Sequence, residues 1–158
     1  MTVVVNDTKW REIAAKVAKI GQYVAKVGVV GPAARVVENG TSMVELAAVH
    51  EFGSRDGTIP ERSFIRSTFA RQRVPLGKMC ERLARMVVTK GMDVHQAMTL
   101  LGAWGASEVR KTITGGHVEP ALKPATIAAK GSSKPLIDTG QLVGAITYEV
   151  SDEVGGER

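Results

Sequence analysis

The sequence predicts an α+β fold, in which a small antiparallel sheet of about two to four strands packs against about four to five helices. Three observations predict this class. Apolar side chains recur every three or four residues in several segments, as they do on the buried face of a helix. Segments 23–30 and 146–150 instead have the alternating pattern of β-strands, and strands and helices do not alternate regularly along the chain. Because these two strands lie near opposite ends of the sequence, we expect them to pair antiparallel and to close the domain.

The composition is that of a globular protein, and we predict a single domain over residues 1–158. A chain of 158 residues is long enough to bury a core but shorter than those that usually divide into domains. Its 44% apolar and 23% charged residues argue against disorder, and no apolar run reaches the ~18 residues of a membrane span. The first residues lack the basic start and apolar stretch of a signal peptide. The single cysteine, Cys80, excludes an internal disulfide and favours a reducing cytoplasm, or a particle assembled there.

In the first forty residues, the pattern predicts one helix followed by one or two strands. The helix covers about 7–20 and stops at Gly21, because its apolar residues share one face. These residues are Trp10, Ile13, Val17 and Ile20. The strand over 23–30 ends at a Gly-Pro pair, and a second short strand over 35–37 ends at an Asn-Gly turn.

Two segments of the form S/T-x-x-E, which is typical of a capping box, predict the starts of two further helices. The first, Ser42–Glu45, opens a helix that ends at Gly53, before a flexible polar loop over about 53–58. The second, Thr58–Glu61, precedes a helix that Pro75 interrupts. The apolar residues that we expect this helix to place in the core are Phe64, Ile65 and Phe69.

The second half of the chain predicts two longer helices, a loop and the last strand. A helix over 76–90 has an apolar face opposite its basic residues, and Asp93 caps a second helix over 94–113. Glycines within this second helix lower its helix propensity and allow another backbone to approach closely. Residues 115–135 predict a flexible loop, because Gly, Pro and Ser are frequent there, and residues 152–158 predict a frayed tail.

Most of the excess positive charge lies in one window of the sequence. The chain has 21 Lys and Arg against 16 Asp and Glu, a net charge of +5. Seven of the basic residues and one acidic residue lie between Arg62 and Arg85, so this window carries +6. Such a patch attracts phosphate groups or an acidic protein surface, although charge runs are also typical of solvated helix faces. The residues that we predict to contact a neighbouring subunit or DNA are Arg62, Arg66, Arg73, Lys78, Arg82 and Arg85.

The sequence contains no complete motif for catalysis, a metal or a cofactor, and we predict that the protein is not an enzyme. His50 and Glu51 begin an H-E-x-x-H zinc motif, but Ser54 stands where the second histidine is required. The loop over 131–134 lacks the G-x-x-x-x-G-K-[ST] sequence of a phosphate loop, and no G-x-S-x-G nucleophile elbow is present. Cys80 falls on an apolar helix face, which predicts a core residue.

The segment Asp138-Thr139-Gly140 has two interpretations. D-T-G is the catalytic tripeptide of aspartic proteases, in which two aspartates of a dimer share a proton and activate water. Alternatively, Asp138 is the N-cap of a short helix with Gln141 at position N3. We favour the helix cap, because retroviral-type proteases are almost entirely β-strand, whereas this chain has mainly helical patterns.

Two stretches of the sequence, taken in order, resemble a family of phage proteins. The first joins H-E-F-G at 50–53, which follows a helix, to I-P-x-R-x-F at 59–64. The second is P-L-x-D-T-G-x-L at 135–142, which precedes the last strand. Together they resemble the tail-completion and head–tail joining proteins, minor tail components of long-tailed double-stranded DNA phages and Mu-like prophages. Glu61 and Ser63 differ from the proline or Ala-Arg-Pro that many relatives have near the first stretch.

This resemblance implies a structural virion protein that forms a ring, commonly a hexamer, at the head-proximal end of the tail or in the neck. The partners that it implies are further copies of the chain, the tail tube or tail-terminator protein, the head-side connector or stopper protein, and packaged DNA contacted without sequence preference. It implies no cofactor, no metal and no membrane, and a location in the virion and, during assembly, in the host cytoplasm. An asymmetric charge suits heterologous ring contacts, in which one face of a subunit meets a different face of its neighbour.

Two other functions stay open at this point. One is a monomeric, non-specific nucleic-acid-binding domain that uses the basic segment over 62–85. The other is the D-T-G protease, which requires Asp138 as a catalytic residue and predicts that Asp138→Asn abolishes peptide cleavage.

Overall fold

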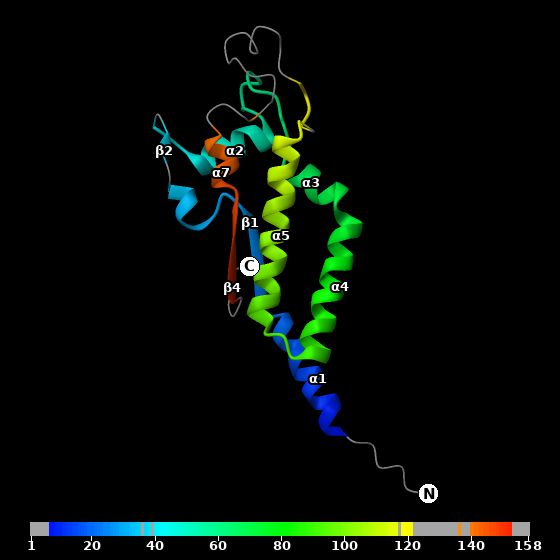
Figure 1. Cartoon of the computed structure of the whole chain (residues 1–158). Helices are drawn as coiled ribbons and strands as arrows, with labels where there is room; N and C mark the ends of the chain where they lie inside the picture. Colours follow the sequence, from blue (N-terminus) through cyan, green and yellow to red (C-terminus); the bar gives the residue numbers. More distant parts are fainter. Residues whose placement is uncertain are drawn as a thin grey trace, which may run out of the picture.

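The computed structural model describes residues 7–35, 37–38, 40–116, 118–121, 136 and 140–152. Figure 1 shows a long helix, α5 (Val94–Thr114), beside a β-ribbon, with α1 (Asp7–Ile20) at one end of the molecule and α2 (Met43–Phe52) at the other. The predicted α+β class is confirmed, because helices pack against a small antiparallel sheet. Among the described helices, none combines the length and the apolar character that crossing a membrane requires.

The central ribbon joins the two strands that are far apart in the sequence. β1 (Tyr23–Gly28) and β4 (Thr147–Asp152) pair antiparallel over their full lengths, which confirms the predicted pairing. β1 ends at Gly28 rather than at Val30, because the chain then turns into a short 3-10 helix, η1 (Gly31–Arg35). The ribbon packs against α5, so two strands that are distant in the sequence are held on one helix.

Helix α5 approaches the ribbon closely at two glycines. Asp93 caps the helix, as predicted, by accepting a hydrogen bond from a backbone N–H of the first turn at 3.2 Å. A Cβ atom added at Gly102 would lie 2.7 Å from the Tyr148 ring, and one added at Gly105 would lie 3.1 Å from Val27. The prediction that another backbone approaches these glycines is wrong, because the atoms nearest to them belong to side chains that fill the space left by the missing Cβ atoms.

Helix α4 (Arg73–Lys90) lies beside α5 and α1 and begins three residues earlier than predicted. Pro75 does not interrupt the helix, because it lies in the first turn, where its missing N–H is not needed. The break from the preceding helix, α3 (Arg66–Arg71), is at Gln72. The buried residues of the small core between α4 and α5 are Leu83, Val87, Val94 and Ala97.

Helix α1 has the predicted bounds, but half of its apolar face is not buried. Ile13 and Ile20 are half-buried, and Ile20 packs against the small core. Trp10 and Val17 are exposed instead. The helical spacing therefore identified the helix correctly but did not show that part of its apolar face lacks a neighbour within the described chain.

At the other end of the molecule, the capping box of α2 is confirmed. The Glu45 backbone N–H donates to Ser42 Oγ at 3.1 Å, and the Ser42 backbone N–H donates to Glu45 Oε2 at 3.0 Å. Gly53 follows the last residue of α2, as predicted. Before α2, β2 (Val37–Glu38) and β3 (Thr41–Ser42) form a short hairpin in place of one predicted strand.

The second predicted capping box is wrong, because residues 53–65 contain no helix. Asp56 organises a turn there instead. Its Oδ1 accepts hydrogen bonds from the Ser54 hydroxyl at 2.6 Å, the Thr58 hydroxyl at 2.8 Å and the Thr58 backbone N–H at 3.1 Å. These hydrogen bonds lower the pKa of Asp56 to about 2. The polar side chains of this loop therefore bind one another and do not start a helix.

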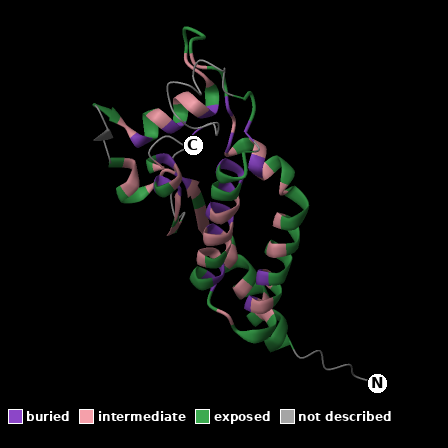
Figure 2. Ribbon diagram, turned by 45° about the horizontal axis from the view of Figure 1, so that its top comes forward, coloured by how far each residue is buried: buried purple, intermediate pink, exposed green. Residues whose placement is uncertain are grey.

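The main core lies where α2, α3, α5 and α7 (Gln141–Ala145) meet. Phe64 is fully buried, and Ile65 and Phe69 pack against the same cluster, so their predicted core role is confirmed. Figure 2 shows buried residues gathered along the central helix and exposed residues along the outer sides of the molecule.

The predicted cap of the last helix is wrong in its position. Helix α7 begins at Gln141, which is therefore N1 rather than N3, and Gly140 occupies the N-cap position without a side-chain cap. Asp138 and Thr139 lie outside the described residues. Most of the predicted loop over 115–135 and of the predicted tail over 152–158 also lies outside them.

Candidate functional site

The six basic residues that we predicted to contact a partner divide into two groups. Arg62 and Arg66 have partners within the chain, next to the C-terminal end of α2. The residues of the second group, which are exposed on α4, are Arg73, Lys78, Arg82 and Arg85. The basic segment over 62–85, which is continuous in the sequence, therefore contributes to two separate regions of the structure.

Near the first group of basic residues, the carboxylate of Glu51 lies close to the backbone that leads into α3. The residue is only 4% exposed. Its Oε2 accepts hydrogen bonds from the backbone N–H groups of Phe64 at 2.7 Å and Ile65 at 2.9 Å. Its Oε1 accepts hydrogen bonds from the Ser63 hydroxyl at 2.8 Å, the Arg66 backbone at 3.0 Å and Arg66 Nε at 3.0 Å. We call these residues the Glu51 junction: Glu51, Ser63, Phe64, Ile65 and Arg66.

The junction explains how α3 starts without a cap of its own. The N-cap residue of α3 is Ile65, which offers no side-chain hydrogen bond. Backbone N–H groups at a helix start lack partners within the helix and must find them elsewhere. Glu51 supplies these partners from α2, which fixes the position of α3 relative to α2.

Arg66 covers the exposed side of the junction. Its Nη2 donates to the Glu51 carbonyl oxygen at 3.0 Å and to Glu61 Oε1 at 2.8 Å. Its guanidinium lies 4.7 Å from the centre of the Phe52 ring, a cation–π contact. The hydrogen bond to Glu51 raises the pKa of Arg66. The Arg66 guanidinium is therefore used mainly within the chain.

Arg62 is also engaged internally. It is 8% exposed, and its Nε donates to the Pro120 carbonyl oxygen at 2.9 Å. Its backbone N–H donates to the His50 carbonyl oxygen at 2.8 Å. Arg62 thus connects the segment over 118–121 to the end of α2.

Glu51 keeps its negative charge although it is buried. Burial raises the pKa of this carboxyl group, but hydrogen bonds from the Ile65 and Arg66 backbone, the Ser63 hydroxyl and the Phe64 backbone outweigh that effect. The pKa of Glu51 therefore lies below its ordinary value of 4.5. A charged carboxylate is the form that accepts all of these hydrogen bonds.

The lowered pKa of Glu51 predicts a pH dependence of folding. The folded chain binds this proton less readily than the unfolded chain, so Glu51 stabilises the fold fully above its unfolded pKa, and the contribution is lost as the pH falls through the folded pKa. We expect the free energy of unfolding to fall more steeply in the wild type than in Glu51→Gln as the pH is lowered below the ordinary carboxyl pKa of 4.5. Urea unfolding at each pH measures both slopes. Parallel slopes in the two proteins would contradict this role of Glu51.

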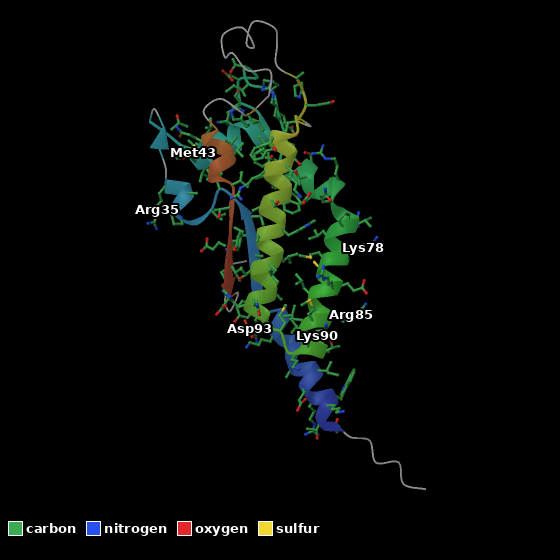
Figure 3. The ribbon with its side chains drawn as sticks, viewed as in Figure 1. Arg35, Met43, Lys78, Arg85, Lys90 and Asp93 are labelled. Atoms are coloured by element: carbon green, nitrogen blue, oxygen red, sulfur yellow. The ribbon has the colours of Figure 1, made fainter. Side chains whose placement is uncertain are left out.

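The second group of basic residues forms a surface on the outer side of α4. Lys78, Arg82 and Arg85 line, with Lys90, an open and shallow recess of about 430 Å³. Figure 3 shows Lys78 and Arg85 on the side of α4 that points away from α5. Glu81 also lines this recess and forms an exposed ion pair with Arg85 at 2.7 Å. We call this surface the α4 basic face: Lys78, Arg82, Arg85 and Lys90.

The α4 basic face offers charge without base stacking. Helix α4 carries five basic residues and one acidic residue, a net charge of +4, and it contains no aromatic residue. Stacking on bases is therefore not available on this helix, whereas attraction to phosphates or carboxylates is. Arg73 is exposed but lies about 140° around the helix from Lys78, so it is not part of this face.

The remaining candidates for chemistry do not form a site in the part of the chain that the structure describes. Within these residues, no group of three or more His, Cys, Asp or Glu could hold a metal ion. The prediction that Cys80 is a core residue is wrong, because Cys80 is exposed. It lies at an apolar recess of about 90 Å³ between α1, α4 and α5, which the buried Leu83 and Val87 also line.

The sequence did not show that Glu51 organises this region. H-E-F-G draws attention to Glu51 only as part of an incomplete zinc motif. A stronger signal is its place near the end of α2, a helix that otherwise consists largely of apolar residues. An acidic residue in such a helix is rarely buried unless it is paired. A buried Glu51 therefore requires hydrogen-bond partners from another segment of the chain.

Comparison of the chain with known proteins identified no relative. No protein-family model matches the chain, and no curated protein and no solved structure matches it. The resemblance to phage tail proteins therefore depends on the two sequence stretches alone.

Proposed function

We propose that the protein is a structural virion component, a tail-completion or head–tail connector subunit whose ring joins the tail tube to the head and continues the DNA channel. The observation that carries the proposal is the Glu51 junction. Glu51 belongs to H-E-F-G, and it binds the backbone of Phe64, which belongs to I-P-x-R-x-F, at 2.7 Å. The two halves of the first phage-like stretch are therefore in direct contact, which supports interpreting them as one motif.

The exposed surface supports a role in assembly. Apolar side chains are exposed at both ends of the molecule: Trp10 and Val17 on α1, and Val44 and Phe52 on α2. Exposed apolar surface of this kind marks contacts with other proteins. The α4 basic face suits an acidic neighbour or the wall of a DNA channel, where attraction without sequence preference lets DNA slide.

The native mass of the purified protein, alone and with tail tubes of its phage, tests this proposal. We expect a ring, and we expect electron micrographs to show that ring at one end of each tube. A chain that stays monomeric and does not attach to tail tubes or heads would overturn the proposal.

The α4 basic face supports a second candidate, a monomeric domain that binds nucleic acid without sequence preference. We expect a variant with Lys78→Glu and Arg82→Glu to bind duplex DNA more weakly than the wild type. The slope of log K against log salt should become shallower by about 1.8, because two phosphate contacts are lost. Fluorescence anisotropy over a series of salt concentrations measures this slope.

The control for this experiment is Arg55→Glu, which reverses the charge of an exposed arginine outside the α4 basic face. It should leave the slope within error of the wild type. Tight binding of duplex DNA by wild-type monomers would favour the second candidate over the ring. Equal slopes in all three proteins would show that the α4 basic face does not contact DNA.

A further inference from the structure

We propose that copies of this chain assemble head to tail, with the exposed apolar side of α1 on one copy seated in an apolar groove beside α2 on the next. This inference rests on the ring proposed above and deepens it, because it identifies the two surfaces that meet. It follows from three features of the structure: an apolar side of α1 that no described residue covers, a groove of matching character, and opposite charge on the two helices.

The first surface is the outer side of α1. Trp10 is 68% exposed and Val17 is 53% exposed. They are about two helical turns apart and lie on the same side of the helix. Figure 1 shows α1 at the end of the molecule, projecting beyond the end of α5. Large aromatic side chains are seldom left in water unless a partner covers them.

The second surface is an open groove of about 310 Å³ where the end of β1 meets α2. Val29, Val44 and Ile65 line it, together with the ring of Phe52, which is 63% exposed. The volume lies at the lower end of the range for ligand pockets. The groove therefore suits one bulky apolar side chain, such as an indole ring, better than it suits an extended peptide.

The charges of the two helices are complementary. Helix α1 carries four basic and two acidic residues, a net charge of +2. Helix α2 carries Glu45 and Glu51 and neither Lys nor Arg. Within the groove, Arg66 pairs with Glu51, so these two charges offset each other, and Glu45 is an exposed carboxylate of α2 next to Val44. Opposite charges of this kind steer two surfaces together and fix their register.

The arrangement of the two surfaces requires a second copy. Figure 1 shows α1 and α2 at opposite ends of the molecule, so α1 cannot reach the groove of its own chain. Contact between two different surfaces is heterologous, and it produces a ring when the rotation between neighbours closes. The occupant of the groove is therefore α1 of the neighbouring copy.

The test uses one variant for each surface. Trp10→Glu places a charge on the outer side of α1, and Ala48→Glu places one on an exposed position of the groove. We expect native mass spectrometry to show each variant alone as a monomer, both without tail tubes and after it has been mixed with them. An equimolar mixture should form a heterodimer and nothing larger, because only Ala48→Glu keeps an intact α1 and only Trp10→Glu keeps an intact groove.

The matched control is Ala15→Glu, which introduces the same charge on α1 about 140° from Trp10. It should assemble like the wild type, and circular dichroism should show the same helix content in all variants. If Trp10→Glu or Ala48→Glu assembles to the wild-type mass, or if their mixture stays monomeric, the inference is overturned while the ring stands. If the wild type itself is monomeric in solution and on tail tubes, the ring and this inference fail together.

Discussion

Replacing Glu51 with alanine is expected to lower the free energy of unfolding by about 3–5 kcal/mol, because each backbone N–H group that is left buried without an acceptor costs about 1–3 kcal/mol. The substitution leaves the backbone N–H groups of Phe64, Ile65 and Arg66 without the acceptor that they have in the wild type. It also removes the carboxylate partner of Arg66 Nε. Urea unfolding monitored by circular dichroism measures the loss, and Glu51→Gln should also be destabilised because its amide NH₂ cannot accept hydrogen bonds.

The control is Glu81→Ala, which removes the partner of Arg85 in an exposed ion pair. Exposed pairs of this type contribute about 0–1 kcal/mol, so the stability should hardly change. If Glu51→Ala is as stable as Glu81→Ala, Glu51 does not anchor α3. That result would also remove the main support for the proposed function, because the two halves of the first phage-like stretch would no longer form one unit.

Replacing Gly102 with valine is expected to destabilise the fold by about 3 kcal/mol, the upper end of the cost of overpacking a core. A Cβ atom at this position would lie 2.7 Å from Tyr148 Cδ2 and 3.0 Å from Tyr148 Cγ. The ring is held between α5 and the ribbon, so either the strand or the helix must move. Gly102→Ala should cost less, because the gain in helix propensity of about 1 kcal/mol offsets part of the clash.

Gly77→Ala is the matched control for this prediction. Gly77 also lies within a helix, α4, but a Cβ atom there meets nothing within 4 Å. We expect this substitution to stabilise the protein by about 1 kcal/mol through helix propensity alone. Thermal unfolding of the three variants should therefore show shifts of opposite sign, and a stable Gly102→Val would mean that α5 and the ribbon are not in close contact.

Patterns that depend on neighbouring residues predicted most of the secondary structure. The N-caps at Ser42 and Asp93 are confirmed, because a cap needs only a side chain and a backbone N–H three residues away. The same short motif at Thr58 failed, since Asp56 offers the nearby hydroxyl groups a better acceptor. Pro75 was also misjudged, because a proline ends one helix or begins another depending on what precedes it.

Burial could not be decided from such patterns, because it depends on segments that are distant in the sequence. Arg62 and Arg82 look alike in the basic window, yet Arg62 is buried against Pro120 while Arg82 is exposed on α4. Trp10 looks like a core residue of an amphipathic helix, yet it faces solvent. Residue order alone was enough for the α+β class, the positions of the first and last strands and the helix starts at Asp7, Met43 and Val94, because these follow from local hydrogen bonding and periodicity. The three-dimensional packing was needed to separate the basic residues that hold the chain together from those that are available to a partner, since that difference depends on which distant side chains come into contact.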